Sequence, residues 1–570
     1  MVTYKVRERT HPELLQDLLT ARGIVGESVI EQFLSPNFER DSHDPFLLPD
    51  MAKAVDRLQL AAKNNEKIAV WSDYDCDGIP GGVLLTEFFR SIGMQVRHYI
   101  PHRHEEGYGL NNEGLTELAN EGIKLIVTVD LGTTDIEPVA HAKKKGIDMI
   151  ITDHHLCSGK LPEAFALINP KRPDSKYPFD GLCGAGVAWK LVQAILIRLR
   201  SQKNISDFDF AEGKEKWLLD LVGIATLSDM VPLVGENRML AHFGLRVMRS
   251  PQLVWRRPGF AALLQMMRIR PSSLTEDDIG FMVAPRINAA SRMGTPQTAS
   301  RLLATADASE AATLARELNA VNDERKSIVA STVKEVNKRL VKSDFTTSPI
   351  IVMGNPNWRP GILGLVASSL VGSHSKPTFL WGRDGSTSSP QEDGLLRGSC
   401  RSDGFVNVVE LMEGAREVFE DFGGHSASGG FSLTQEKVPE LAPKLMLAYE
   451  KLLSSGVKAK EIMLDRQLEL AEVPNTLKVL SKLAPFGVGN TKPLFLLPSV
   501  SIAQARMFGK QQNHLDLTLE QSGNRVGGIA FFSTPASFTK KFEVGSKADI
   551  IGHIELDWKG APRLRIIDIL

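Results

Sequence analysis

The chain is poor in cysteine and has no paired cysteine motif. Its 570 residues include four cysteines, which are widely spaced and form no C-x-x-C pair: Cys76, Cys157, Cys183 and Cys400. A disulfide framework or a cysteine-rich zinc site is therefore not expected. The expected compartment is a reducing cytoplasm.

Long apolar runs and a strong net charge are also missing. No segment approaches the ~20 apolar residues that span a membrane, and the N-terminal sequence MVTYKVRERTHPELL has no apolar core typical of a secretory signal. We therefore expect no membrane association. The net charge of −1 argues against a uniformly basic nucleic-acid coat, although a local basic channel is compatible with it.

The composition is that of an ordinary globular protein. Hydrophobic residues make up 42% and charged residues 24%, which excludes a mainly disordered, collagen-like or coiled-coil chain. A chain of this length suggests about four domains.

From residue 67 onward, short apolar runs alternate with segments of helical spacing. The runs are IAVWS (68–72), QVRHYI (95–100), LIVTV (125–129) and MIIT (149–152). Strands that alternate with helices in this way predict a doubly wound parallel sheet, within a first α/β domain at 67–307. The preceding residues, 1–66, are predicted to be an N-terminal helical lead-in.

Three further segments follow. Residues 308–343 predict one helix of roughly 50 Å, either a core helix or a connection between two lobes. Residues 344–456 predict a second α/β domain with two glycine-rich stretches, GLLRGSCRSDG and GGHSASGG. The tail, 457–570, contains the strand-like runs EIMLDRQLEL, LDLTLEQ, VGGIAFF, ADIIGHIEL and LRIIDI, which predict a small barrel or sandwich.

Acidic and imidazole side chains follow three of the predicted strands. These are Asp73, Asp75 and Asp77 after 68–72, Asp130 after 125–129, and Asp153, His154 and His155 after 149–152, with Asp229 before a proline turn. Ligands bind at the carboxyl ends of strands in open α/β sheets, so these groups should converge. Clustered carboxylates with histidine and no thiolate favour Mn²⁺ or Mg²⁺, and two such ions suit phosphoester hydrolysis.

The motifs resemble those of the DHH phosphoesterase family over nearly the whole chain. The four family motifs appear as DYDCDG (73–78), VDLG (129–132), DHH (153–155) and SDMVP (228–232), and GGHSASGGFSL (423–433) resembles the DHH-associated domain. The resemblance implies an OB-fold for the tail and two Mn²⁺ or Mg²⁺ ions. It implies metal-ligand roles for Asp75, Asp77, Asp130, His154 and Asp229, with Asp73 and His155 close by in the catalytic site.

Several assignments stay open at this stage. Asp73 and Asp153 could instead accept backbone N–H bonds at strand ends, and His155 could orient a ligand or contact phosphate. Leu131 stands where the family usually has asparagine, which removes a polar group from the site. The loop sequence IPGG (79–82) replaces small hydroxyl residues that are common in the family.

Further polar residues are expected to bind DNA or phosphate. Arginine suits phosphate because its planar fork donates two hydrogen bonds, while aromatic side chains stack on bases. The alternative for each arginine is a surface salt bridge. The candidates are Arg103, Tyr108, Arg286, Asn288, Arg292, Ser399, Arg401, Ser402 and His425.

The resemblance implies an exonuclease that degrades single-stranded DNA from the 5′ end to 5′-mononucleotides in DNA repair and recombination. It also implies work alongside a helicase and a single-strand-binding protein. One alternative is a DHH phosphodiesterase of cyclic dinucleotides or short oligoribonucleotides, which generally lacks the barrel. The other is a non-catalytic DHH scaffold of a replication complex, which would have lost metal ligands.

Overall fold

The computed structural model describes residues 3–103, 106–157, 159–201, 212–342, 348–383, 395–454, 461–509, 512–557 and 559–570. The chain forms two compact units. One contains residues 1–42, 232–239 and 459–570, and the other contains residues 43–231 and 240–458. Residues 1–42 thus group with the tail, and 43–66 with the larger unit. The domain limits expected from the sequence remain predictions.

The first α/β domain is built on a parallel sheet, as predicted. Its five strands have the spatial order β3-β2-β4-β5-β6 and are β2 (Ile68–Ser72), β3 (Val96–Tyr99), β4 (Leu125–Val129), β5 (Asp148–Thr152) and β6 (Ala166–Ile168). β2 and β4 are buried along their whole length, which explains their continuous apolar sequences. The strand order reverses between β2 and β4, so a ligand site is expected at their carboxyl ends.

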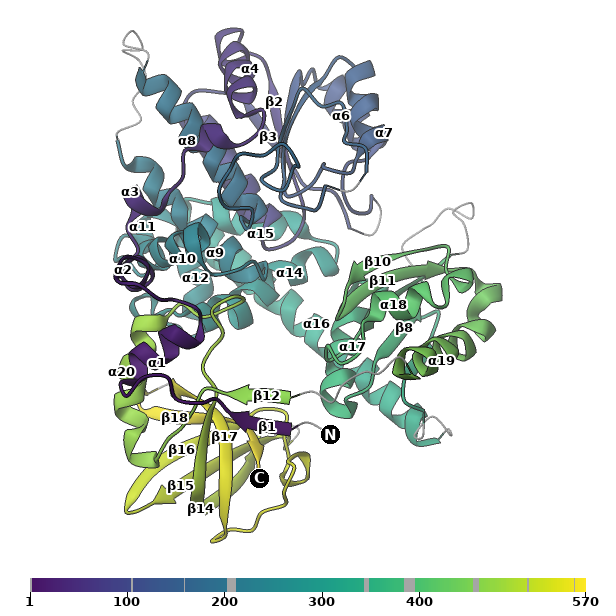
Figure 1. Cartoon of the computed structure of the whole chain (residues 1–570). Coiled ribbons are helices and arrows are strands. Elements are labelled where there is room, and N and C mark those ends of the chain that lie inside the picture. Colours follow the sequence, from purple (N-terminus) through teal and green to yellow (C-terminus); the bar gives the residue numbers. More distant parts are fainter. Residues whose placement is uncertain are drawn as a thin grey trace. The chain divides into compact units, whose positions relative to one another are not determined.

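Helices surround this sheet and extend the domain (Figure 1). Those before and between the strands are α4 (Met51–Lys63), α5 (Gly78–Ser91), α6 (Asn112–Asn120) and α7 (Ile136–Lys144). Those that follow are α8 (Gly184–Ser201), α9 (Leu219–Ser228), α10 (Gly235–Met248), α11 (Leu253–Arg256), α12 (Pro258–Met266), α13 (Glu276–Asp278), α14 (Ala284–Arg292) and α15 (Pro296–Ala304).

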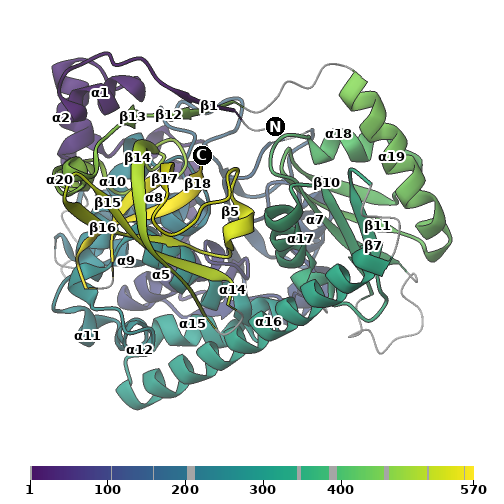
Figure 2. The same ribbon diagram turned by 90° about the horizontal axis from the view of Figure 1, so that it is seen from below.

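A single helix, α16 (Ala308–Lys342), follows, and in Figure 2 it runs past α12, α15 and α14 as far as α17. Its 35 residues span about 52 Å. Val336 and Leu340 near its end pack in the core of the second α/β domain, whereas Ala311, Leu314 and Leu318 are buried near its start. Of the two expected roles, the structure therefore supports the connecting helix.

The second α/β domain contains a mixed five-stranded sheet. Its order is β10-β11-β9-β8-β7, with strands β7 (Ile351–Gly354), β8 (Thr378–Gly382), β9 (Leu396–Arg401), β10 (Asp421–His425) and β11 (Ser428–Leu433). Only the β7–β8 pair is parallel among these strands. The helices are α17 (Pro360–His374), α18 (Val408–Glu413) and α19 (Val438–Ser454).

The smaller unit contains a closed β-barrel. Its strands are β14 (Phe495–Phe508), β15 (His514–Gln521), β16 (Asn524–Ala530), β17 (Lys547–Leu556) and β18 (Pro562–Ile569), and a β14–β17 pairing closes the sheet. Helices α1 (Leu14–Ala21), α2 (Glu27–Leu34) and α20 (Val473–Leu483) share its core. A short helix, α3 (Phe38–Asp41), follows α2.

One predicted strand of the tail was placed wrongly. The run EIMLDRQLEL forms β12 (Glu461–Leu464), which pairs with β1 (Thr3–Val6) outside the barrel, and the two-residue β13 (Arg466–Gln467), which pairs with β14 at the edge of the barrel sheet. The first barrel strand is β14, which the apolar runs did not indicate. The predicted barrel is confirmed, but with this different first strand.

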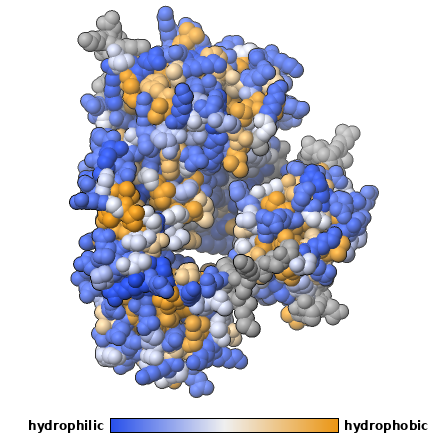
Figure 3. Space-filling model, viewed as in Figure 1, coloured by the Kyte–Doolittle hydropathy of each residue, from blue (hydrophilic) through white to orange (hydrophobic). Residues whose placement is uncertain are grey.

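None of the helices in the described part of the chain is long and apolar enough to cross a membrane. The face in Figure 3 is mainly hydrophilic, with small groups of apolar side chains between charged ones.

Candidate metal centre and phosphate-binding groups

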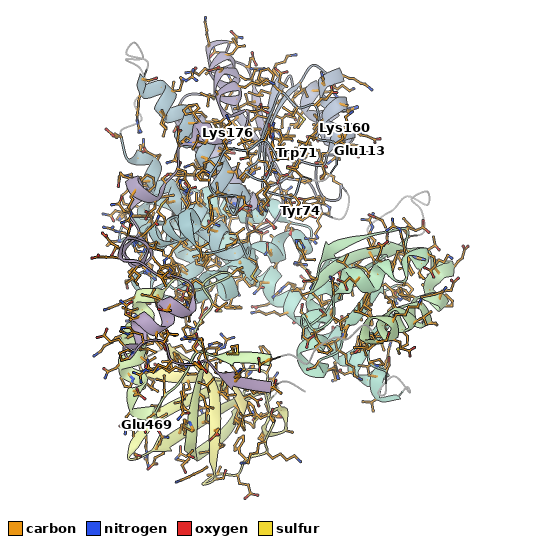
Figure 4. All side chains as sticks on the ribbon, viewed as in Figure 1. Trp71, Tyr74, Glu113, Lys160, Lys176 and Glu469 are labelled. Carbon is orange, nitrogen blue, oxygen red and sulfur yellow. The ribbon has the colours of Figure 1, made fainter. Side chains whose placement is uncertain are left out.

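The acidic and imidazole residues lie where the neighbouring strands β2, β4 and β5 end. Asp73 follows β2, Asp130 follows β4, and Asp153 begins the segment after β5. Figure 4 labels Trp71 within β2 and Tyr74 just beyond its end, which marks this edge of the sheet. The backbone amides of Asp73 and Asp130 continue the ladder by donating to Val129 (3.1 Å) and Thr152 (3.0 Å).

The first acidic loop is a tight turn into α5. The Asp75 Oδ1 atom accepts hydrogen bonds from the backbone amides of Asp77 (2.8 Å) and Gly78 (3.0 Å). A Cβ atom on Gly78 would lie 2.5 Å from the Asp73 carbonyl oxygen, so the turn requires glycine at this position. The turn brings three carboxylates of one short loop to the sheet edge.

Asp77 is held by the first residues of α8. Its two carboxylate oxygens accept from the backbone amides of Gly184 (2.6 Å) and Ala185 (2.8 Å), a helix N-terminus that favours negative charge. A Cβ atom on Gly184 would lie 2.5 Å from the Cβ atom of Asp130. The glycine therefore lets this helix approach both carboxylates.

Asp130 adopts a left-handed backbone conformation, with φ of +65°. Aspartate tolerates this region better than most residues. The turn sends the following side chain, Leu131, away from the site into the apolar core beside Ile151, where it is 1% exposed. The departure from the family pattern at Leu131 therefore fills the core.

Asp153 supports the two histidines that follow it. Its Oδ1 atom accepts from the backbone amides of His154 (2.7 Å) and His155 (3.2 Å) and lies 2.8 Å from His155 Nδ1. Its other oxygen accepts from the Thr133 amide (2.9 Å). Of the two readings left open for Asp153, the hydrogen-bond acceptor is the one that the structure supports.

Seven side chains form a continuous set of possible metal ligands. Three groups have ligand atoms within 4.8 Å of one another, and they are Asp73–Asp75–Asp130, Asp77–His154–Asp229 and Asp130–His154–His155. The Nε2 atom of His154 lies 3.1 Å from Asp130, 3.6 Å from Asp229 and 3.7 Å from Asp77. Because Asp130 and His154 each belong to two groups, the set can hold adjacent ions.

The electrostatics of this set favour cations. Burial and neighbouring carboxylates raise the pKa of Asp77 to about 6 and of Asp229 to about 9, and raise the pKa of Asp73 and Asp130 well above the usual value. Burial lowers the pKa of His154 to about 3, so this imidazole is neutral, as a metal ligand must be.

The donor atoms fit hard or borderline divalent cations. Among the described residues, the buried oxygens Asp73 Oδ1, Asp130 Oδ1 and Asp229 Oδ2 accept no hydrogen bond. Cys76 and Cys183 are close by but belong to none of the three ligand groups. Oxygen and imidazole ligands without thiolate suit Mn²⁺ or Mg²⁺, so the residues fit the expected ions.

Part of the expected phosphate-binding set lies beside this centre. The Arg103 guanidinium stacks over the Tyr74 ring at 4.8 Å. The Tyr108 side chain is 53% exposed, and its hydroxyl is 3.4 Å from His155 Nε2. Burial, together with the nearby positive charges of Arg103, Arg325 and Arg401, lowers the pKa of Arg292 to about 9. Such a group of arginines favours an anion.

Arg286 and Ser402 are engaged elsewhere. Arg286 donates to Asn319 (3.1 Å) and to the Met282 carbonyl (2.7 Å), and both bonds stay within the helical part of the domain. The buried Ser402 hydroxyl donates to the Val406 carbonyl (2.6 Å), which closes a turn. These contacts explain both residues structurally.

The remaining candidates of the second α/β domain share three adjacent strands. His425 on β10 pairs with Ser428 on β11, which in turn pairs with Arg401 on β9. Ser399 lies two residues before Arg401 and therefore on the same face of the sheet. The expected residues of both glycine-rich stretches are thus neighbours, with Ser402 just beyond β9.

The sequence did not indicate two polar residues with buried side-chain atoms, Asn322 and the half-buried Arg325. Asn322 is fully buried, and its side-chain amide makes no hydrogen bond with any described residue, nor does Arg325 Nε. Both lie on α16, and the expected Asn288 on α14 also has a buried, unbonded Oδ1 atom. Within the charged sequence NDERK (322–326), nothing distinguishes them from solvent-facing residues.

Comparison with known proteins supports the same family. Three descriptions match: "DHH family, N-terminal domain" at residues 67–226, "DHHA1 domain" at 347–451 and "RecJ OB domain" at 464–568. The single-stranded-DNA-specific exonuclease RecJ of Bacillus subtilis is 31% identical over 560 residues, which cover 97% of this chain and 67% of that protein. The RecJ of Dickeya dadantii is 31% identical and covers 95% of this chain and 93% of its own length.

A solved structure agrees with these relatives. RecJ from Thermus thermophilus in complex with Mn²⁺ superposes with a TM-score of 0.77 and 26% sequence identity, over 100% of this chain and 79% of that chain. The fold, the ordered motifs and the relatives lead to one conclusion: the chain belongs to the RecJ family of DHH proteins.

Proposed function

We propose that the chain is a metal-dependent exonuclease that hydrolyses single-stranded DNA from the 5′ end to 5′-mononucleotides. The observation that carries this proposal is the set of seven ligand side chains at the carboxyl ends of β2, β4 and β5. The RecJ relatives, which are named single-stranded-DNA-specific exonucleases, support the substrate. The catalytic residues are Asp73, Asp75, Asp77, Asp130, His154, His155 and Asp229.

The cofactor is Mn²⁺ or Mg²⁺. Bound ions of this kind activate a water nucleophile and neutralise charge that develops at phosphorus. Asp77 and Asp229 would hold one ion with His154, and Asp73 and Asp75 the other, while Asp130 is placed to contact both.

His155 is placed to act on the phosphate. Burial alone would lower the pKa of His155, but the hydrogen bond with Asp153 raises it above the ordinary value, which favours the protonated ring. Its Nε2 atom points toward the Tyr108 hydroxyl at the exposed side of the site. A protonated imidazole there can donate to a phosphate oxygen, while Tyr108 stacks on a base.

A pocket for the terminal phosphate would supply the 5′ polarity, since a metal centre alone does not distinguish the two ends. We assign this pocket to Arg103, Arg292, Ser399, Arg401 and His425, and we add Arg325 because its charge acts on Arg292. Asn288 is included because it lies four residues before Arg292 on α14 and its Oδ1 atom accepts no hydrogen bond from the described residues.

The function is tested with single strands labelled at the 5′ or the 3′ end in the presence of Mn²⁺. Early release of labelled mononucleotide from the 5′-labelled strand is the expected result. Early release from the 3′-labelled strand would contradict the direction, and resistance of both strands would contradict the activity.

The phosphate pocket is tested separately. Arg292→Ala and Arg103→Ala should slow digestion of 5′-phosphorylated strands more than of 5′-hydroxyl strands. Arg301→Ala is the matched control because its exposed guanidinium is paired with Glu310. If all three variants keep the wild-type ratio between the two substrates, the pocket lies elsewhere.

The cellular role is part of the proposal. A strand-specific exonuclease of this family would act in DNA repair and recombination, with a helicase that supplies single strands and a single-strand-binding protein. The cytoplasm is the compartment in keeping with the four free cysteines.

A further inference from the structure

A second basic feature lies away from the metal centre. The 39 residues between Glu236 and Glu276 contain seven arginines, no lysine and no carboxylate, whereas the remainder of the chain has a net charge of −8. Such a local charge asymmetry indicates a polyanionic partner.

Five of these arginines are exposed, namely Arg246, Arg249, Arg256, Arg268 and Arg270. With Trp255, which is 86% exposed, they define what we call the Arg–Trp face. None of the five forms an ion pair with a carboxylate in the part of the chain that the structure describes. The nearby carboxylates Glu87 and Asp220 are instead paired with the buried Arg257, at 2.5 and 2.8 Å.

A local contact joins several members of this face. Arg246 and Arg249 are three residues apart at the end of α10, which places them on the same side of that helix. Arg249 Nε donates to the Leu274 carbonyl (2.7 Å), and this bond joins the end of α10 to the loop that carries Arg268 and Arg270. Trp255 and Arg256 follow on α11.

The contacts of Arg256 show that this face lies away from the metal centre. Its guanidinium stacks over Trp217 at 4.6 Å, and Trp217 lies directly before α9. Asp229 lies at the other end of α9, whose ten residues span about 15 Å. The Arg–Trp face is therefore beside the opposite end of this helix from the metal ligands.

The chemistry of the face favours nucleic acid over a protein partner. Guanidinium groups donate two hydrogen bonds to one phosphate, which makes arginine the preferred residue for phosphate backbones. An exposed indole among them offers a stacking surface for an unpaired base. Glu276 and Asp278 lie near Arg249, but among the described residues they form no ion pair with the five arginines, so the face keeps an excess of positive charge.

We propose that the Arg–Trp face is a second nucleic-acid-binding site, which holds phosphates of single-stranded DNA outside the metal centre and stacks one base on Trp255. The inference rests on the proposed substrate but concerns binding and not hydrolysis. The second site would keep a long strand bound to the protein between successive cuts.

The test is equilibrium binding of a long 5′-labelled single strand to the full chain in a chelator, across a series of salt concentrations. The triple variant Arg246→Gln, Arg256→Gln, Arg270→Gln should bind at least ~10-fold more weakly, with a salt slope reduced by about 2, as expected for three lost phosphate contacts. Trp255→Ala should lose about 5- to 100-fold in affinity, and Trp255→Phe should restore most of it.

A matched control replaces three exposed arginines that are paired with glutamates elsewhere, as Arg301→Gln, Arg416→Gln and Arg525→Gln. This variant should bind like the wild type. Hydrolysis of a dinucleotide, which is too short to span α9, should be unchanged in every variant.

If the triple variant and Trp255→Ala both kept the wild-type affinity and salt slope, the proposal would be overturned. A face that binds a protein instead of DNA would give this same result. Digestion of the long strand by the wild-type protein is measured in parallel, and this measurement tests the proposed function alone. A wild-type protein that binds strands through this face without digesting them would contradict the function and leave the binding site standing.

Discussion

At the scale of single residues, Asp130 combines a left-handed backbone conformation with a place in two of the three ligand groups. Asparagine also tolerates a φ of +65°, so Asp130→Asn removes the charge and keeps the turn. We expect a loss of at least ~10³ in turnover, because the lost group acts on the transition state. Steady-state rates with Mn²⁺ check this, and circular dichroism checks the fold. The exposed Asp174→Asn is the control, and a near-normal rate for Asp130→Asn would remove Asp130 from the centre.

His98 offers a prediction about pH that does not involve the metal ligands. Its ring lies between the hydroxyls of Ser72 (2.9 Å) and Ser300 (3.1 Å), and it occupies the space that a side chain at Gly82 would fill. Burial, together with the positive charge of Arg90, lowers its pKa from 6.5 to about 3. The glycine at position 82 therefore leaves room for an enclosed neutral imidazole.

A lowered histidine pKa means that the unfolded chain binds the proton first. The stabilising contribution of His98 is thus complete above pH 6.5 and is lost as the pH falls toward about 3. The slope is at most about 1.4 kcal/mol per pH unit. His98→Gln should unfold with a flatter pH dependence in this window, measured by denaturant titration. If the free energy of unfolding depended on pH in the same way in the wild type and in His98→Gln, the lowered pKa of His98 would be contradicted.

At the scale of secondary structure, the start of α8 sets the spacing of the centre. In Gly184→Ala the new methyl group would lie 2.5 Å from Asp130 Cβ, so the helix must move away from Asp77 and Asp130. We expect about a 10²-fold loss of rate and weaker Mn²⁺ binding, measured by titration calorimetry.

Gly186→Ala is the matched control for this helix. Its Cβ atom would have its nearest neighbours at 3.6 Å, an ordinary contact, so the variant should keep its activity. Alanine within a helix also adds up to about 1 kcal/mol of stability relative to glycine. Equal activity losses in the two variants would mean that general helix perturbation, not the contact with Asp130, is responsible.

The sequence predicted best the strands that are buried on both faces along their whole length. The runs at 68–72 and 125–129 are buried on both faces and match β2 and β4 residue for residue. β14 escaped notice because Pro498 interrupts its apolar pattern and Ser499 has a φ of +52°, where the pairing with β17 shifts register. Its second half alternates between barrel core and surface, which resembles a polar segment in the sequence.

At the scale of the whole molecule, the convergence of the possible metal ligands was predictable from the sequence, whereas the buried polar groups of α16 were not. Strand ends in a parallel sheet converge whatever the distance along the chain, so the sequence placed Asp73, Asp130 and His154 together. Asn322 and Arg325 depend instead on which side of α16 packs against α14. A helix that is charged on most sides gives no periodic signal for that choice.

Metal removal is the prediction that concerns the whole molecule. Five carboxylates of the ligand set lie close together, and burial together with their mutual repulsion raises the pKa of four of them. Bound Mn²⁺ relieves this repulsion in the folded state alone, so it should raise the free energy of unfolding by about 2.7 kcal/mol at a hundred times its dissociation constant. Chelation should abolish hydrolysis and lower the melting temperature, and Mn²⁺ should restore both, whereas stoichiometric Zn²⁺ should not restore hydrolysis.

Asp130→Asn should show a smaller Mn²⁺-dependent rise in melting temperature than Asp174→Asn. If Mn²⁺ raised the melting temperature equally in both variants, the stabilising ion would bind outside the ligand set and the assigned centre would be wrong.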